Sequence, residues 1–119
     1  GVSNIICSNN SVDIYNPKVV QATMGSLARV KVHYTDIEGV INQLPNNFPI
    51  YGACMDGKNV TDIVIEKDAI LIIGNESFGI SKKVNQLIKQ RIIIPRKKEG
   101  AESLNVAIAT SILLHEFRR

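Results

Sequence analysis

Short apolar segments alternate with amphipathic segments along the chain. The apolar segments are rich in β-branched residues and have the length of strands, and they are VSNIIC (2–7), ARVKVHY (28–34), FPIYGAC (48–54), AILIIG (69–74) and RIIIP (91–95). The segments between them carry apolar residues at helical spacing, as does LNVAIATSILLHEF (104–117). Because strands that alternate with helices favour parallel pairing, the pattern predicts an α/β domain with a mostly parallel sheet flanked by helices.

Polar residues mark the predicted helix starts. Asn16 suits an N-cap and Pro17 the first helical position, TDIE (35–38) matches a capping box, and Ser81 is the predicted cap of a third helix. The apolar positions expected to share a face in these three helices are Val19, Val20, Met24, Leu27 and Ala28; Ile37, Val40, Ile41 and Leu44; and Val84, Leu87 and Ile88. The turn-rich MDGKN (55–59) is expected to end the strand before it.

The composition indicates one globular domain. The chain has 119 residues without a repeat or a low-complexity linker, so we expect a single domain over residues 1–119. Hydrophobic residues make up 45% and charged residues 21%, a globular balance, and the longest apolar run is far too short to span a membrane. The net charge of +3 is compatible with an anionic partner but too mild to identify one.

The cysteines and histidines give no sign of a metal or of disulfide bonds. Cys7 and Cys54 are the two cysteines, with neither a CxxC motif nor clustered histidines, so we expect two buried thiols in a reducing, cytoplasmic setting and no zinc site. Gly1 is not followed by a signal-like segment, which leaves secretion without support. His33 and His115 lie away from the loops described next and are expected to be structural.

Three polar loops follow predicted strands, and ligands of parallel α/β sheets bind beyond the carboxyl ends of the strands. These loops are ACMDG (53–57), GNESFG (74–79) and PRKKEGAES (95–103). The glycine spacing of GNESFG imitates a P-loop, but Ile80 and Ser81 stand where Lys and Ser or Thr are required, and no GxGxxG motif is present. A phosphate-binding loop and a Rossmann-type nucleotide site are therefore poorly supported.

Two readings remain for GNESFG and for AESLNVA (101–107). Asn75 and Glu76 could belong to a tight turn with a solvated carboxylate, or they could deliver polar groups to a ligand that the flanking glycines allow to approach closely. Ser103 could simply cap the last helix. Capping by Ser103 does not explain why Asn105 enters an otherwise apolar helix, and this makes Asn105 a candidate functional residue.

A family resemblance rests on these loops. ILIIGNESFGIS (70–81), followed by IIIPRKKEGAESLNVAIATSILLHE (92–116), resembles the second and third motifs of the SpoU (TrmH-like) RNA 2′-O-ribose methyltransferases of the SPOUT superfamily. VDIYNPKVVQATMGSLARVKV (12–32) is similar to the middle segment of that family. The resemblance implies methyl transfer from S-adenosylmethionine to a ribose 2′-hydroxyl of tRNA or rRNA, a homodimer, and a C-terminal trefoil knot, which periodicity alone would not suggest because knots are very rare.

The resemblance also implies roles for individual residues. Those that would border the cofactor are Ala53, Gly74, Ile94, Pro95, Ser103 and Leu104, and those that match the polar positions around cofactor and ribose, and so the catalytic set, are Glu76, Ser103 and Asn105. The reaction needs alignment of two reactants and removal of a proton, and it needs no metal. Arg96, Lys97 and Lys98 could contact RNA phosphates or form a solvated charged loop.

The last helix and the start of the chain give two further expectations. Ile108, Ile112 and Leu113 are expected to form one face of a helix that is apolar most of the way round, which favours cover by a second subunit. The family's first motif, with an Asn and an activating Arg, has no counterpart, so we expect a domain that is N-terminally incomplete and that binds cofactor but transfers methyl groups slowly as given. The alternative function is an RNA-binding module that keeps the fold without catalysis.

Overall fold

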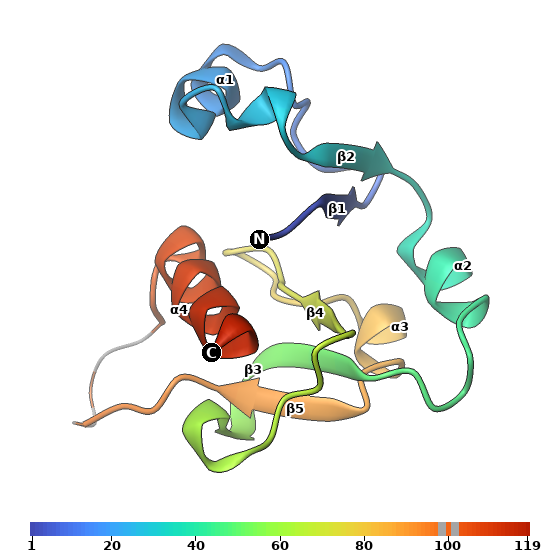
Figure 1. Cartoon of the computed structure of the whole chain (residues 1–119), viewed down its shortest axis with the longest axis vertical. Helices are drawn as coiled ribbons and strands as arrows, with labels where there is room; N and C mark the ends of the chain where they lie inside the picture. Colours follow the sequence, from blue (N-terminus) through green and yellow to red (C-terminus); the bar gives the residue numbers. More distant parts are fainter. Residues whose placement is uncertain (98–99, 101–102) are drawn as a thin grey trace. The chain divides into compact units, whose positions relative to one another are not determined.

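The computed structural model of the chain describes residues 1–97, 100 and 103–119 (Figure 1). The chain divides into two compact units, an N-terminal unit of Gly1–Leu44 and a C-terminal unit of Pro45–Arg119. Each unit contains its own parallel sheet, so the predicted parallel pairing is confirmed, whereas the described strands form two sheets and not the one that was expected. Among the described residues, no helix has the length and apolar character needed to cross a membrane.

The N-terminal unit is built on two strands, and its helices are shorter than predicted. Strand β1 (Asn4–Cys7) pairs in parallel with β2 (Lys31–Tyr34), and Asn4 lies opposite Lys31. The other elements of the unit are α1 (Pro17–Thr23), a 3-10 helix (Ser26–Ala28) and α2 (Ile37–Asn42).

Asn16 caps α1 as predicted, because its side-chain oxygen accepts a hydrogen bond from the Lys18 amide at 3.0 Å. The predicted continuous face from Val19 to Ala28 is wrong: the helix stops at Met24, whose φ of 49° is left-handed, and Met24 is 88% exposed.

The start of α2 also differs from the prediction by one residue. Asp36 is the N-cap, and its carboxylate accepts from the Gly39 amide at 3.2 Å, so Thr35 does not occupy the capping position of the expected box. An Asp is as good a cap as a Thr, and the sequence alone does not choose between adjacent candidates. Of the apolar residues predicted to face inward, Ile41 is buried.

The C-terminal unit holds a three-stranded parallel sheet in the order β4-β3-β5, with β3 in the centre. Its elements are β3 (Ile50–Asn59), a 3-10 helix (Val60–Asp62), β4 (Ile70–Ile72), α3 (Lys82–Asn85), β5 (Gln90–Ile93) and α4 (Val106–Arg118). Ser81 caps α3 as predicted, with its hydroxyl oxygen 3.4 Å from the Val84 amide, although the helix ends at Asn85, before Leu87 and Ile88.

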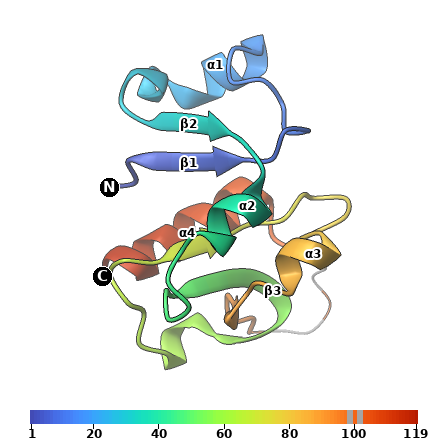
Figure 2. The same cartoon turned by 90° about the vertical axis from the view of Figure 1, so that its right-hand side faces the viewer.

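The core of the C-terminal unit joins the sheet to the last helix (Figures 1 and 2). Tyr51 of β3, Val60, Ile92 of β5 and Leu113 of α4 form one buried cluster, in which Ile92 is fully buried. Phe117 stands edge-on to the Tyr51 ring at a centroid distance of 5.2 Å, a favourable aromatic geometry. Leu113 therefore faces the core, while Ile108 and Ile112 are 55% and 37% exposed, so these three residues do not share the single face that was predicted.

Strand β3 does not end at Cys54. Ala53 and Lys58 both lie opposite Ile92 of β5, so residues 54–57 leave the ladder and return to it, and we call this segment the β3 excursion. Gly57 makes the return possible: a Cβ there would stand 2.4–2.6 Å from the backbone of Ile92. The expectation that MDGKN ends the strand is therefore wrong, because pairing resumes within this segment, at Lys58 and Asn59.

Candidate functional site

A pocket of about 420 Å³ lies within the C-terminal unit, where the sheet strands end and α4 begins. Four separate segments line it: the end of β3 with the β3 excursion, the loop after β4, the end of β5, and the start of α4. The lining residues are Ala53, Cys54, Met55, Ile73, Gly74, Asn75, Glu76, Gly79, Ile92, Ile93, Ile94, Arg96, Ser103, Leu104, Asn105, Val106, Ala109 and Leu113. Mostly apolar walls with a few convergent polar groups are typical of a small-molecule site.

The loop after β4 is a tight turn fixed by its own hydrogen bonds. The backbones of Asn75 and Gly79 exchange two hydrogen bonds, of 3.0 and 2.8 Å, and the Asn75 side-chain oxygen accepts from the amides of Ser77 at 2.7 Å and Phe78 at 3.2 Å. Gly74 cannot be replaced without displacement, since a Cβ there would lie 2.5 Å from the carbonyl carbon of Gly79. The loop is therefore the tight turn of the first reading, built by Asn75, and it places the exposed Glu76 at the pocket; delivery of polar groups to a ligand stays a prediction.

The structure of the start of α4 explains why a polar residue, Asn105, stands next to an apolar helix. Asn105 is the N-cap of α4, and its side-chain oxygen accepts from the amides of Ala107 at 2.9 Å and Ile108 at 3.4 Å. The residue precedes the apolar helix and does not enter it, so capping explains its side-chain oxygen. Its side-chain amide nitrogen is the part left for a ligand. Ser103, the expected alternative cap, is exposed and lines the pocket.

The β3 excursion lies within the candidate loop ACMDG (53–57) and supplies one wall of the pocket. Cys54 and Met55 line the pocket, and Asp56 holds the excursion against β5 by accepting hydrogen bonds from the Nε of Arg91 at 3.0 Å and from its terminal nitrogen at 2.7 Å. The hydrogen bond from Arg91 lowers the pKa of the Asp56 carboxyl. Partial burial raises the pKa of the Cys54 thiol, with the positive charge of Arg91 acting in the opposite direction. The glycine inside an otherwise extended stretch was the available signal for this irregularity.

The basic residues that follow β5 differ in their placement. Arg96 lines the pocket and its guanidinium donates to the sulfur of Met55 at 3.2 Å. Pro95 and Lys97 are not among the lining residues. Lys98, the third residue predicted to contact RNA, lies outside the described residues.

The pocket thus brings together most of the residues singled out from the sequence. Those that line it are Ala53, Gly74, Glu76, Ile94, Arg96, Ser103, Leu104 and Asn105. Their individual roles stay predictions. Cys54 and Met55 belong to the candidate loop ACMDG (53–57), but sequence reasoning did not single them out as site residues.

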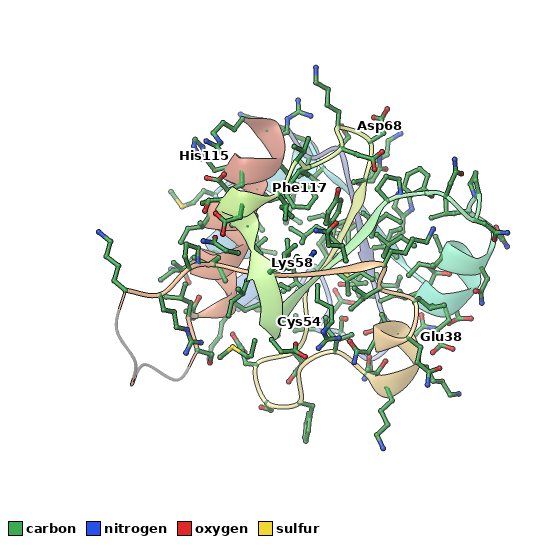
Figure 3. The ribbon with its side chains drawn as sticks, turned by 90° about the horizontal axis from the view of Figure 1, so that it is seen from below. Glu38, Cys54, Lys58, Asp68, His115 and Phe117 are labelled. Atoms are coloured by element: carbon green, nitrogen blue, oxygen red, sulfur yellow. The ribbon has the colours of Figure 1, made fainter. Side chains whose placement is uncertain are left out.

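Of the two cysteines and two histidines, Cys54 lines the pocket and the other three residues do not. Cys7 and Cys54 are free thiols, and both are partly exposed and not buried as expected. Neither histidine lines the pocket, and Figure 3 shows His115 and Phe117 well away from Cys54. His33 lines a separate hollow of the N-terminal unit, where its Nε2 lies 3.2 Å from the side-chain oxygen of Asn4. In the part of the chain that the structure describes, no three His, Cys, Asp or Glu residues are grouped to hold a metal ion.

Comparison with known proteins gives concordant matches along the chain. The model of the SpoU rRNA Methylase family matches residues 1–115. A 23S rRNA guanosine 2′-O-methyltransferase of Bacillus subtilis (strain 168) is 26% identical over 120 residues, which cover 99% of this chain and 48% of the relative.

Solved structures agree with the sequence matches. A protein of the TrmH family from Porphyromonas gingivalis superposes on this chain with a TM-score of 0.84 and is 37% identical to it in sequence. The match covers 98% of this chain and 48% of the Porphyromonas gingivalis chain. The SpoU methyltransferase AviRb from Streptomyces viridochromogenes, in complex with the cofactor AdoMet, has a TM-score of 0.83 and 27% identity, covering 96% of this chain and 48% of its own. The chain therefore spans about half the length of the relatives that it matches.

Proposed function

Since the chain belongs to the SpoU rRNA methylase family, we propose that it carries out methyl transfer from S-adenosylmethionine to a ribose 2′-hydroxyl of tRNA or rRNA. The observation that carries the proposal is the gathering of Gly74, Glu76, Ser103, Leu104 and Asn105 around one pocket, although they come from two distant parts of the sequence. AviRb, similar to this chain in sequence and fold, is seen with AdoMet, which supports the choice of cofactor.

The residues of the pocket fit S-adenosylmethionine. The volume of about 420 Å³ lies in the range of small-molecule sites. Apolar side chains such as Ile73, Ile94 and Leu104 suit the faces of an adenine, and Glu76, Ser103 and the amide of Asn105 can hydrogen-bond to hydroxyl groups. Glu76 is the one carboxylate among the described lining residues, and a negative charge suits a ligand that carries a sulfonium.

The chain's own residues would contribute position and hydrogen bonding. The cofactor, when bound, supplies an activated methyl group, and the acceptor hydroxyl must lose its proton as the new bond to oxygen forms. We assign to Glu76, Ser103 and Asn105 the orientation of the ribose and cofactor hydroxyls, since alignment of two reactants is a large part of such a barrier. Ala53, Gly74, Ile94, Pro95 and Leu104 are assigned to the wall around the cofactor. Arg96, Lys97 and Lys98 are assigned to RNA phosphates.

Two structural features belong to the same proposal. The segment at Ser103–Asn105 and the loop 74–79 line one pocket, which supports a C-terminal segment threaded past that loop as a trefoil knot. Ile108 and Ile112 lie one helical turn apart on α4 and are 55% and 37% exposed, which supports a homodimer through the last helix.

Binding of S-adenosylhomocysteine tests the cofactor assignment. We expect isothermal titration calorimetry to show binding to the protein, and Leu104→Glu to abolish it, because a charge would enter the apolar wall. Leu104 is half exposed, so the variant should fold. Val64→Glu is the matched control, since Val64 is exposed and does not line the pocket. Absence of binding to the folded, unmodified protein would refute the assignment.

Methyl transfer itself is tested on RNA. Ribose methylations would be mapped in tRNA and rRNA from a strain that lacks the gene and from its parent. We expect one or more 2′-O-methylated positions to disappear, and the gene carrying Leu104→Glu to leave them absent. An unchanged methylation map would favour the non-catalytic RNA-binding alternative.

A further inference from the structure

The loop between β4 and α3 exposes an aromatic side chain on a turn whose backbone is fixed by hydrogen bonds. Phe78 is 91% exposed, whereas Phe is a residue that proteins usually bury. The amide of Phe78 donates to the side chain of Asn75, and the two backbone hydrogen bonds between Asn75 and Gly79 close the turn around it. Since the backbone of this turn is already ordered, binding through the ring costs little backbone freedom.

Two lysines follow directly on the same segment. Lys82 and Lys83 are exposed, they begin α3 after the cap Ser81, and neither forms an ion pair with any described residue. With four residues, α3 has Lys82 and Lys83 in its first and last turns alike, so the helix dipole gives no reason for their charges. Neither helix stability nor an ion pair therefore accounts for two positive charges here.

This segment is continuous with the pocket. Gly74, Asn75, Glu76 and Gly79 line the pocket, so Phe78 and the two lysines lie on the chain immediately beside those lining residues. Figure 2 shows the loop reaching beyond the end of β4 before the chain turns back into α3. An aromatic ring and positive charges next to a small-molecule pocket are the features of a surface for single-stranded nucleic acid.

We propose that residues 78–83 bind single-stranded RNA beside the acceptor ribose. Phe78 stacks on a base, and Lys82 and Lys83 contact the phosphates next to it. The inference rests on the proposed function and extends it, because a base that is free to stack is offered by a single strand or loop and not by the interior of a duplex. The favoured substrate region is therefore an unpaired one.

The stacking contact is tested by fluorescence anisotropy with a labelled oligouridylate of about twelve nucleotides. We expect Phe78→Ala to weaken binding at least about fivefold, and Phe78→Tyr to retain most of it, because base stacking needs the ring. Val64→Ala is the matched control, since Val64 is also 91% exposed, and it should leave binding unchanged. Equal affinities of Phe78→Ala and the unmodified protein would overturn the inference.

A tryptophan provides a direct readout. The sequence contains no Trp, so Phe78→Trp introduces a single one at the loop. We expect the oligouridylate to quench its fluorescence, and the same sequence in a duplex with oligoadenylate to quench it much less. Equal quenching by both would overturn the preference for single strands.

The lysines are tested through the salt dependence of the same binding reaction. Lys82→Gln with Lys83→Gln should reduce the slope of log affinity against log salt by about 1.4, since each phosphate contact to a single strand contributes about 0.7. Lys67→Glu changes the net charge by the same amount at an exposed site outside this segment and should leave the slope nearly unchanged. Equal slopes in the double variant and the control would overturn the phosphate assignment.

Two further measurements separate this inference from its alternatives. Binding of S-adenosylhomocysteine should be the same in Phe78→Ala and the unmodified protein, so a failure of the cofactor assignment is visible independently of RNA binding. Sedimentation of Phe78→Ala should match that of the unmodified protein. If the substitution instead converts a dimer to a monomer, the ring binds a second copy of the chain and the inference is wrong.

Discussion

At the scale of single residues, Asn105 shows how one side chain can serve both the fold and the site. Its oxygen caps α4 through the amides of Ala107 and Ile108, and the same residue lines the pocket. Loss of activity on mutating Asn105 would therefore not distinguish the two roles by itself. A substitution that keeps the cap and removes the amide nitrogen does distinguish them.

Replacement of Asn105 by Ala and by Asp separates capping from chemistry. Asn105→Ala should destabilise the protein by about 1 kcal/mol through the lost cap. Asn105→Asp keeps a capping oxygen, and its charge is favoured at a helix start, so its unfolding midpoint should match that of the unmodified protein. If the amide nitrogen takes part in methyl transfer, activity should be low in both variants. Full activity in Asn105→Asp would limit Asn105 to capping.

The ion pair at the β3 excursion gives a pH dependence whose sign follows from the lowered pKa of Asp56. A carboxyl whose folded-state pKa is lowered contributes stability above its unfolded-state pKa, near 3.9, and that stability is lost as the pH falls through the folded-state pKa. Asp56→Asn should therefore flatten the fall of thermal stability below about pH 4. Both partners are substantially exposed, so the effect should be small and should shrink in high salt. An unaltered pH profile would contradict the role of Asp56.

At the scale of elements, local sequence signals predicted the alternation of strands and helices. They failed where the course of a strand depends on residues that are distant in the sequence. The caps Asn16 and Ser81 were predictable because a capping side chain bonds to amides two or three residues away. The course of β3 was not, because the resumption of pairing at Lys58 depends on Ile92, which is far away in the sequence. The pocket residues of the loop after β4 belong to a recognisable motif, whereas Cys54 and Met55 were indicated only by their position in a loop after a predicted strand.

Gly57 is the residue on which the β3 excursion depends. Gly57→Ala would place a methyl group within 2.4–2.6 Å of the Ile92 backbone, which has little freedom to move, and we expect a loss of about 1–3 kcal/mol in the free energy of unfolding. Gly52→Ala is the matched control, because the three atoms nearest to its methyl group all belong to the Ile88 side chain, which can change rotamer, and none to the backbone. Chemical denaturation gives the free energy of unfolding of both variants. A smaller loss in Gly57→Ala than in Gly52→Ala would contradict this account.

At the scale of the whole molecule, the exposed stripe on α4 raises the question of assembly. Ile108 and Ile112 point away from the core that Leu113 enters, and apolar residues repeated along one helix face are characteristic of an interface. The sequence predicted that a second subunit covers part of this helix, although it grouped Leu113 on one face with the two isoleucines.

Sedimentation velocity tests the assembly. We expect a dimer at micromolar concentration, and Ile108→Glu with Ile112→Glu should shift it to a monomer because two charges would enter an apolar interface. Val64→Glu, on an exposed residue outside α4, should leave the dimer intact. A monomer in the unmodified protein would refute the homodimer.

The buried cluster of the C-terminal unit also has a consequence for the order of folding. Tyr51 and Leu113 pack together although about half of the chain separates them, so the contact requires a large loop to close before it contributes stability. The three strands can pair earlier, but the start of α4 is one wall of the pocket. Helix docking and pocket formation should therefore share one slow kinetic phase. A chain that has formed its sheet but has not yet docked α4 should have no affinity for the cofactor.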